Sequence, residues 1–235
     1  MEDSIYSNGK YLESNPTYDI EHSGWKAELI YRLATEIIPI PANVVEVGCG
    51  AGGILAELGS KWKEAQCKGF DISPAAIELA TKFNSSNTSY VCGDLLETDA
   101  SSDLVVCADV FEHVDDYVGF LRDLRKHGSH FAFHIPLDLS VATIVVPSVF
   151  AILREKVGHI HYFNKETALA TLRFCGYEVL ASEVTAGCIE FPGRGLQAGL
   201  LLQLRKLVFR LSPDLAARVL GGFSLLVMAK ASAEA

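Results

Sequence analysis

Short apolar strands that alternate with helices are the feature that most constrains how this 235-residue chain can fold. Strand-like segments occur at 42–50, 67–73, 88–94, 103–110 and 130–136, and helix-like segments separate them at 51–62, 74–84 and 116–127. Parallel strands need a crossover connection, usually a helix, to join them. This order therefore predicts an α/β fold in which helices cover both faces of a mostly parallel sheet, with ligands at the carboxyl ends of the strands.

The first and last helices of the pattern carry recognisable end signals. We expect a helix at 23–38 that begins at Ser23, because serine is a favourable cap and apolar residues follow at helical spacing. A later helix at 165–175 is expected to begin at Asn164 and to end at Gly176.

Two more strands are expected at 176–184 and 223–231, with a long connection between them. The chain shows no internal repeat and no low-complexity linker, and 235 residues can bury a core that needs no disulfides. We therefore expect a single domain over residues 1–235.

Charge and apolar content narrow the range of partners. A formal net charge of -9 repels a phosphate backbone, and no basic block interleaved with aromatic residues is present, so we expect no nucleic-acid partner. The longest apolar region, Leu137–Leu153, contains Asp138 and Pro147 and is shorter than the roughly 20 residues that span a bilayer. The first segment, MEDSIYSNGKYLESNP, is polar and acidic, unlike a signal peptide, so a cytoplasmic location is expected.

The six cysteines are spread along the chain without a C-x-x-C pair. Several lie inside apolar runs, which is typical of small buried side chains in a reducing compartment. We expect neither disulfides nor cysteine metal ligands.

The stretch VVEVGCGAGG, from Val44 to Gly53, is the densest glycine cluster in the chain. It fits both the G-x-G-x-x-G pattern of dinucleotide folds and a G-x-G-x-G pattern, so the glycines alone leave the ligand open. Glu46 lies two residues before Gly48, where a carboxylate would repel a pyrophosphate and attract a cationic group. The acid therefore favours a ligand that carries positive charge.

The ordered set EVGCGAGG, GFDIS, CGD and VCADVFEHV resembles the class I S-adenosylmethionine-dependent methyltransferases, in particular the small-molecule group that includes ubiquinone-biosynthesis enzymes. The resemblance runs from about Val44 to Val184. It implies a Rossmann-like, doubly wound sheet of seven strands, mostly parallel with an antiparallel last strand. It also implies S-adenosyl-L-methionine as cofactor, S-adenosyl-L-homocysteine as product, and methyl transfer to oxygen or nitrogen of a small molecule.

The same resemblance implies a cofactor site at the ends of the first four strands. The glycine loop and the acid before it would surround the methionyl and ribose parts through Glu46, Gly48, Cys49, Gly50 and Gly52. The acid after the second strand would accept hydrogen bonds from both ribose hydroxyls, a task for which a carboxylate is well suited. The remaining assignments are Asp71 at the ribose, Ile72 on the adenine face, Asp94 at the adenine amino group, Leu95 beside the adenine ring, and Asp109 at the methyl-transfer region.

Two of these acids have a structural alternative. Asp71 precedes Ser-Pro and Asp94 follows a glycine, so each could simply belong to a turn. A dinucleotide oxidoreductase would also place an acid after its second strand, so Asp71 does not discriminate between cofactors, whereas Asp94 and the FEHV segment do.

Histidines near the strand ends are candidates for removing the acceptor's proton. Methyl transfer from a sulfonium is an in-line displacement that mainly requires positioning, and a neutral histidine suits proton removal where it is needed. The four candidates are His113, His134, His159 and His161. We expect His113 and His161 to be catalytic, together with Asp109, and His134 to be structural. Glu112 would line the pocket or orient His113.

The residues after Asp109 argue against a metal-dependent mechanism. Metal-dependent O-methyltransferases hold a cation with several carboxylate or amide ligands, and the usual acidic and amide pair is missing after Asp109. We therefore expect no metal, and a mechanism of positioning with a histidine base.

Three regions remain for binding the acceptor. Residues 1–40 are expected to form an N-terminal cap and helix, and 137–157 and 185–215 to be lids or acceptor-side insertions. The side chains of the first region that could fold over the cleft are Tyr18, His22 and Trp25. The apolar character of 137–157 favours an apolar or sugar-containing small-molecule acceptor.

Leucines at helical spacing in 196–211 form an apolar stripe opposite Arg205, Lys206 and Arg210. A basic amphipathic helix can lie on an anionic membrane surface, but such a stripe more often covers a core or forms a dimer contact. We expect one of the latter two, so a homodimer is one of the open alternatives.

Two other functions are compatible with the sequence. The G-x-G-x-x-G spacing also fits an NAD(P)-binding oxidoreductase. Because the sequence does not identify the base uniquely, a non-catalytic cofactor-binding protein is also open.

Overall fold

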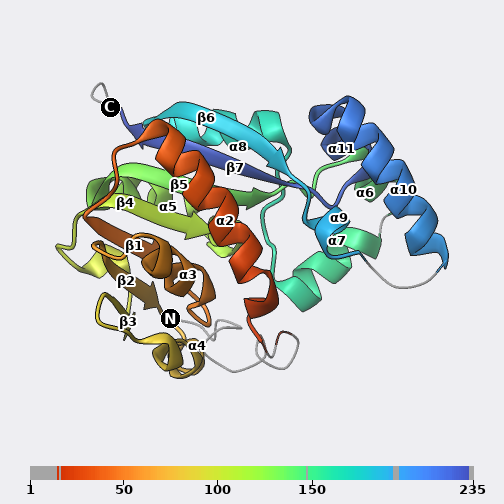
Figure 1. Cartoon of the computed structure of the whole chain (residues 1–235). Helices are drawn as coiled ribbons and strands as arrows, with labels where there is room; N and C mark the ends of the chain where they lie inside the picture. The colour runs from red at the N-terminus through yellow and green to blue at the C-terminus, as the bar shows by residue number, and fades with distance from the viewer. Residues whose placement is uncertain (1–14, 16, 147, 193–195, 233–235) are drawn as a thin grey trace.

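A seven-stranded sheet forms the centre of the molecule in the computed structural model, which describes residues 15, 17–146, 148–192 and 196–232 (Figure 1). The strand order is β3-β2-β1-β4-β5-β7-β6. The strands are β1 Asn43–Val47, β2 Gln66–Asp71, β3 Thr88–Cys92, β4 Ser102–Ala108, β5 Gly128–Pro136, β6 Tyr177–Thr185 and β7 Ser224–Ala231. The pairs from β3 to β5 are parallel, whereas β7 runs antiparallel between β5 and β6. The predicted α/β class and the antiparallel last strand are confirmed.

Each face of the sheet is covered by helices and has its own core (Figure 1). One face carries α2 (Ile20–Ile37) and α3 (Gly53–Lys61), and the other carries α5 (Tyr117–Leu124), α8 (Lys165–Phe174) and α11 (Pro213–Leu220). Along β4, Leu104 and Val106 pack with the first pair of helices, and Val105 and Cys107 pack with the second set. Successive side chains of a strand point to opposite faces, so β4 is apolar from Leu104 to Ala108 because both of its faces are covered there.

The start of α2 differs from the prediction. The helix begins at Ile20, with Asp19 in a left-handed conformation before it and no side-chain cap. Ser23 lies inside the helix and is buried against Gly53. A Cβ added to Gly53 would lie only 2.5 Å from the Ser23 Oγ. The predicted cap at Ser23 is therefore wrong. This serine is instead a small side chain packed between α2 and α3.

The later end signals are confirmed. The Asn164 side chain accepts a hydrogen bond from the Thr167 N–H, and the Thr167 hydroxyl accepts one from the Asn164 N–H, which forms a capping box at the start of α8. Gly176 follows α8 with φ 88, a left-handed conformation that favours glycine at a helix end.

The two regions predicted as lids contain short helices. Region 137–157 forms α6 (Val141–Val145), α7 (Ser148–Ile152) and one π-helical turn (Leu153–Val157). Region 185–215 forms α9 (Gly187–Glu190) and α10 (Leu196–Leu211) and enters α11. These helices lie together beyond one end of the sheet (Figure 1). The division of the chain into lids and a single domain stays a prediction.

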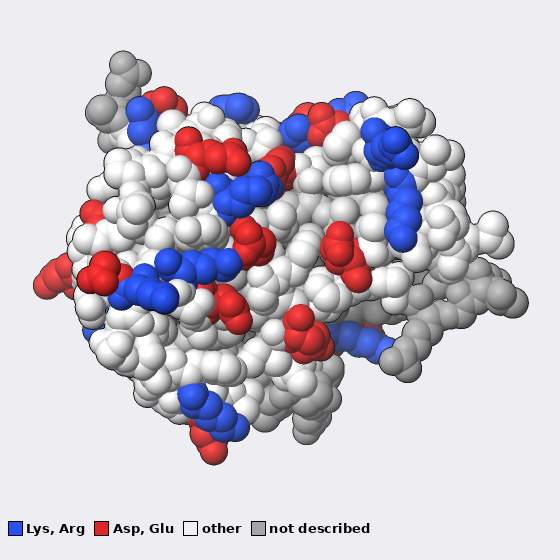
Figure 2. Space-filling model, in the orientation of Figure 1, with Lys and Arg blue, Asp and Glu red and all other residues white. Residues whose placement is uncertain are grey.

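The leucine stripe of α10 faces outward. Leu200 and Leu211 are more than three quarters exposed, and Leu204 and Leu207 about half. The interpretation that this stripe covers the core is therefore wrong for these four leucines, and a homodimer contact stays a prediction. None of the helices in the described part of the chain is long and apolar enough to cross a membrane. On the face drawn in Figure 2, acidic and basic side chains are intermixed and no broad basic area is visible.

Candidate functional site

The loop after β1 is shaped by glycines that tolerate no side chain. Gly48, Gly50 and Gly52 all have positive φ, which L side chains rarely adopt. A Cβ on Gly48 would lie 2.6 Å from a methyl of Val110, and one on Gly52 would lie 2.7 Å from the Tyr90 ring. The backbone therefore makes a close turn between β1 and α3, and the Cys49, Gly50 and Gly52 N–H groups in it donate hydrogen bonds within the protein.

Asp71, at the end of β2, holds this loop in place. Its Oδ2 accepts a hydrogen bond from the Gly50 N–H at 2.8 Å, and its Oδ1 accepts one from the Ser73 N–H at 2.8 Å. Burial raises the pKa of Asp71, and the two N–H donors offset part of this effect. The turn role that we weighed for Asp71 is thus present, and the remaining lone pairs of its oxygens leave room for a ligand's hydroxyls.

Glu46 lies beneath the same loop, on β1, with 2% of its surface exposed. The Leu55 N–H donates to its carboxylate, but its Oε2 is buried without a hydrogen-bond partner among the described residues. Burial raises the pKa of Glu46 well above its usual range, and the nearby charge of Asp71 adds to this effect. An unpartnered buried carboxylate oxygen is costly unless a donor from a ligand completes it.

The other predicted cofactor residues divide into exposed and buried side chains. Ile72 is 59% exposed, so its side chain is available to pack on a flat ring. Asp94 accepts a hydrogen bond from the Leu96 N–H at 2.9 Å and begins a short helical turn. The side chains of Cys49 and Leu95 are buried in the two cores, so a ligand could reach only their backbone atoms. The predicted side-chain contact of Leu95 with an adenine ring therefore has no support in this arrangement.

Asp109, directly after β4, is the centre of a buried polar network. Its Oδ2 lies 2.6 Å from Nζ of Lys26 on α2, and its Oδ1 lies 2.9 Å from Nδ1 of His134 on β5. A carboxylate only accepts hydrogen bonds, so Nδ1 of His134 carries the proton, and its Nε2 lies 3.1 Å from the Thr185 hydroxyl. Both ring nitrogens of His134 thus have side-chain partners, and its structural role stays a prediction.

Charge decides the ionisation of this network. Burial alone would raise the pKa of Asp109, but Lys26 and His134 outweigh it and hold the pKa of Asp109 far below its usual range. Burial would lower the pKa of Lys26, but the charge of Asp109 outweighs it and raises the pKa of Lys26. The pair is thus ionised at neutral pH, and the charge of Lys26 balances that of Asp109 at the carboxyl end of β4.

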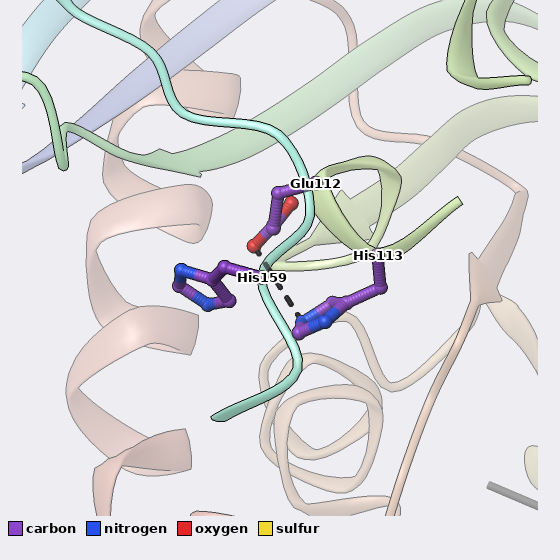
Figure 3. Close-up of side chains that lie close together, drawn as sticks. All are labelled: Glu112, His113 and His159. Atoms are coloured by element: carbon purple, nitrogen blue, oxygen red, sulfur yellow. Dashed lines mark ion pairs between the residues drawn. The ribbon is translucent and has the colours of Figure 1, made fainter. Parts of the chain in front are cut away.

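Glu112, His113 and His159 converge beside this network (Figure 3). Glu112 and His113 lie in a short helical turn after β4, and His159 lies in the segment before α8. Glu112 Oε1 is 3.9 Å from His113 Nε2, and one candidate ligand atom from each of the three residues lies within 4.8 Å of the others. Burial, together with Asp109, raises the pKa of Glu112 well above its usual range, and burial with His159 lowers the pKa of His113 to about 4.

His161 has a different environment from His113. Its Nε2 lies 3.0 Å from the Val114 carbonyl oxygen and 3.3 Å from that of Asp115, and its ring packs against Tyr117. Carbonyl oxygens only accept, so Nε2 of His161 is a donor and is already used in holding the chain. Its Nδ1 then has the lone pair, so the predicted role of His161 as a base stays a prediction.

Aromatic side chains of α2 cover the network around Asp109. The Trp25 ring meets His134 edge to face at 6.2 Å and Phe191 at 5.8 Å, and the His22 ring lies 4.1 Å from Phe191. Tyr18 lies beside Gly50, whose added Cβ would be 3.6 Å from the Tyr18 side chain, and its hydroxyl lies 3.1 Å from that of Ser73 at the start of α4 (Pro74–Ala80). The part of the predicted N-terminal cap from residue 17 onward thus lies over the site, while residues 1–14 fall outside the described part of the chain.

Sequence reasoning missed Lys26, Thr185 and Asp138. Lys26 lies at the border of the apolar stripe of α2, where a lysine normally faces solvent, so nothing in the local pattern marks it. Asp138 binds His159 at 2.6 Å from a separate loop. Such partners become visible only when distant segments are brought together.

A family model and several curated relatives that match this chain are methyltransferases. The family model described as methyltransferase domain matches residues 21–182. The chain is 34% identical over 113 residues to ajmaline N-methyltransferase of Rauvolfia serpentina, which covers 43% of this chain and 38% of that protein. It is 36% identical over 92 residues to the ubiquinone biosynthesis O-methyltransferase of Neisseria meningitidis, which covers 36% of this chain and 38% of that protein. The matched part spans a little over a third of the length of these curated relatives.

A solved structure extends the likeness over the whole fold. The N-methyltransferase NodS from Bradyrhizobium japonicum WM9, in complex with S-adenosyl-L-homocysteine, matches with a TM-score of 0.61 and 18% identity. The match covers 97% of this chain and 99% of that chain. At this identity the likeness concerns the fold alone.

Proposed function

The chain belongs to the methyltransferase domain family, and on that premise we propose that it is an enzyme that transfers a methyl group from S-adenosyl-L-methionine to an oxygen or nitrogen atom of a small molecule. The observation that carries this proposal is the pairing of Glu46 with the glycine loop at the carboxyl edge of the sheet. Relatives with matching segments are named as N- and O-methyltransferases, which supports both acceptor atoms equally.

The residues at this edge fit the cofactor. The unpartnered Oε2 of Glu46 can accept from the methionyl ammonium, whose positive charge would stabilise a carboxylate that burial otherwise disfavours. Asp71 can accept from the ribose hydroxyls while it keeps its two backbone bonds, and the exposed side chain of Ile72 can cover one face of the adenine. When bound, S-adenosyl-L-methionine supplies an already activated methyl group, so the protein's task is positioning.

A pyrophosphate fits this edge less well. Glu46 and Asp71 both lie against the glycine loop, and the Gly50 N–H, which could otherwise donate to a phosphate, already donates to Asp71. A dinucleotide would bring its phosphates close to these acids, and like charges at short range repel. The site therefore supports a cationic sulfonium cofactor over a nicotinamide dinucleotide.

Calorimetry separates these alternatives. We expect the purified chain to bind S-adenosyl-L-homocysteine and to show no heat with NADH. We also expect it to form S-adenosyl-L-homocysteine from S-adenosyl-L-methionine with some members of a panel of apolar aglycones and glycosides, because exposed apolar residues of α6 and α7 line the predicted lid. Binding of NADH without binding of the homocysteine product would overturn the proposal. Cofactor binding without turnover of any acceptor would favour a non-catalytic protein.

His113 is the group that we place on the acceptor side. Its Nδ1 lies 2.9 Å from the Gly158 carbonyl oxygen and therefore carries the proton, so Nε2 has the lone pair of a neutral ring. With a pKa of about 4 this nitrogen is a weak base, so its expected contribution is a neutral lone pair held close to the acceptor.

Replacement of His113 by alanine should therefore lower turnover and leave cofactor binding intact. We expect His113→Ala to reduce kcat by about tenfold or more, while the affinity for S-adenosyl-L-homocysteine changes little. His130→Ala is a matched control, because His130 lies near the start of β5, at the opposite edge of the sheet. An unchanged kcat in His113→Ala would show that His113 has no part in the acceptor step.

A further inference from the structure

Glu112 is a buried acid whose role the cofactor does not explain. It is completely buried, and neither of its carboxylate oxygens has a hydrogen-bond partner at acceptable geometry among the described residues. Leaving a buried carboxylate without donors is costly, and native proteins rarely keep such a group unless an ion or a ligand completes it. The side chain points toward His113 and His159 (Figure 3), so the missing partner belongs between these three residues.

Each of the two histidines donates its Nδ1–H to an oxygen atom, as histidine ligands of metal ions do. The Gly158 carbonyl oxygen lies 2.9 Å from Nδ1 of His113, and the Asp138 carboxylate lies 2.6 Å from Nδ1 of His159. Both acceptors fix the proton on Nδ1 and leave Nε2 as the nitrogen with the lone pair. A histidine ligand almost always donates its other ring N–H to a carboxylate or a carbonyl in this way.

The backbone fixes the cluster from both sides. The Ile160 and His161 N–H groups donate to the Glu112 carbonyl oxygen at 3.0 and 3.1 Å, while the His113 ring binds back to Gly158. The segment that carries His159 is therefore tied directly to the turn that carries Glu112 and His113. The backbone of Glu112 and the rings of both histidines are thus placed by hydrogen bonds that do not depend on an ion.

We propose that Glu112, His113 and His159 form a binding site for a single divalent transition-metal ion. Their ligand atoms lie within 4.8 Å of one another, and a tetrahedral ion would draw them together to about 3.4 Å. Two imidazoles and one carboxylate suit Zn²⁺, Mn²⁺ or Fe²⁺, and leave at least one position open for another ligand. Mg²⁺ and Ca²⁺ prefer oxygen ligands and fit this donor set less well.

With this ion bound, the mechanism would no longer be metal-free, and the Nε2 lone pair of His113 would bind the ion instead of meeting the acceptor directly. The expectation of a metal-free mechanism rested on the absence of an acidic and amide pair after Asp109, whereas the donors here come from Glu112, His113 and the distant His159. The third ligand lies beyond the end of β5 in the chain, so the FEHV segment alone could not indicate a complete site.

The open position gives the site a role in the reaction, which rests on the proposed function. A hydroxyl group of the acceptor that binds the ion loses its proton to solvent water more readily, because the ion stabilises the resulting oxyanion. That oxygen forms the new bond to the methyl carbon. The electron pair of the broken S–CH₃ bond stays on sulfur, so the sulfonium becomes a neutral thioether. The ion thus favours an oxygen acceptor whose proton must leave.

Metal titration tests the site without a known acceptor. The full chain is treated with EDTA, desalted and titrated with MnCl₂ and separately with ZnCl₂, and the bound metal is measured after gel filtration. We expect the wild-type chain to retain roughly one ion per chain. Mn²⁺ is the more selective probe, because free cysteines such as the exposed Cys92 bind Zn²⁺ in preference to Mn²⁺.

Four variants identify the ligands. Glu112→Gln keeps the shape of the buried side chain. Both Glu112→Gln and His159→Ala should weaken binding of Mn²⁺ by about tenfold or more. Asp138→Asn, which alters only the partner of His159, should weaken it by about tenfold. His130→Ala removes an imidazole at the other edge of the sheet and should bind like the wild type.

Two results would overturn the site: wild-type protein that retains no Mn²⁺, or Glu112→Gln and His159→Ala that both retain it as the wild type does. Binding of S-adenosyl-L-homocysteine is measured on the same samples in EDTA. Metal-free protein that still binds this product, without retaining Mn²⁺, refutes the metal site and leaves the proposed function standing. Thermal unfolding of each variant in EDTA confirms that a loss of metal is not a loss of the fold.

Discussion

Asp109→Asn is expected to destabilise the folded protein by about 3 kcal/mol at pH 7. The substitution removes the negative charge that lies 2.6 Å from Nζ of Lys26 and leaves a mostly buried ammonium without its counter-charge. Asparagine keeps the size of the side chain and tolerates the positive φ of 54 at this position, so the loss reports the charge and not the backbone. Chemical denaturation of both proteins, with equal slopes, measures the difference.

A second substitution separates the ion pair from the rest of the network. Lys26→Met in the Asp109→Asn background removes the stranded charge, so the double variant should regain part of the lost stability. Asp109→Ala should be less stable than Asp109→Asn by roughly 1 kcal/mol, because alanine gains nothing from the left-handed conformation. A double variant no more stable than Asp109→Asn would contradict the assignment of the loss to Lys26.

The same pair has a defined pH dependence. The folded pKa of Asp109 lies below its unfolded value of about 3.9, so the stabilisation is complete above that pH and disappears as the pH falls toward the folded pKa. The difference in unfolding free energy between wild type and Asp109→Asn should therefore be constant from pH 7 to about pH 5 and should shrink below about pH 4.

Asp71→Ala is expected to weaken binding of S-adenosyl-L-homocysteine by about a hundredfold. The carboxylate would bind both ribose hydroxyls, and two hydrogen bonds to a charged group are together worth about 3 kcal/mol. The variant also frees the Gly50 N–H, so the glycine loop loses one of its anchors. Calorimetric titration of the variant gives the change in affinity directly.

Asp103→Ala is the matched control for this experiment. Asp103 also accepts two backbone N–H bonds, from Ala42 and Asn43, but it does so at the opposite end of β1. Both variants should lose similar amounts of stability, and only Asp71→Ala should lose affinity. Equal affinities in the two variants would mean that Asp71 serves the turn alone, which is the structural role that the sequence also allowed.

The sequence was sufficient for those parts of the fold that depend on local signals. The strands and most helices follow from apolar periodicity, and Asn164 and Gly176 mark helix ends through interactions within one or two turns. Ser23 shows where local signals fail, because the same residue type is favourable as a cap and as a small side chain between two helices. Only the contact with Gly53 distinguishes these roles.

The candidate site could be predicted where it follows the strand ends, and not where it depends on distant pairs. Asp71 and Asp109 lie at the ends of their strands, as expected, so a parallel sheet brings them to one edge. Lys26 reaches Asp109 from 83 residues away, and His159 joins Glu112 from another segment. A single sequence contains no signal for which distant residues will meet. Burial also limited the prediction. The motif gave the position of Leu95 in the chain, but it did not show that the side chain points into the core and not toward the cofactor site.

The position of β7 has a consequence for the order in which the molecule can form. A ribosome produces β1 to β6 before residues 224–231, yet β7 lies between β5 and β6 in the finished sheet. A nascent chain that has emerged as far as β6 can assemble the parallel strands, but β5 then has an open edge and β6 has no neighbour. Such edges promote association between chains. In the interval between synthesis of β6 and of β7, the open edges of β5 and β6 are therefore expected to be sites at which nascent chains could associate.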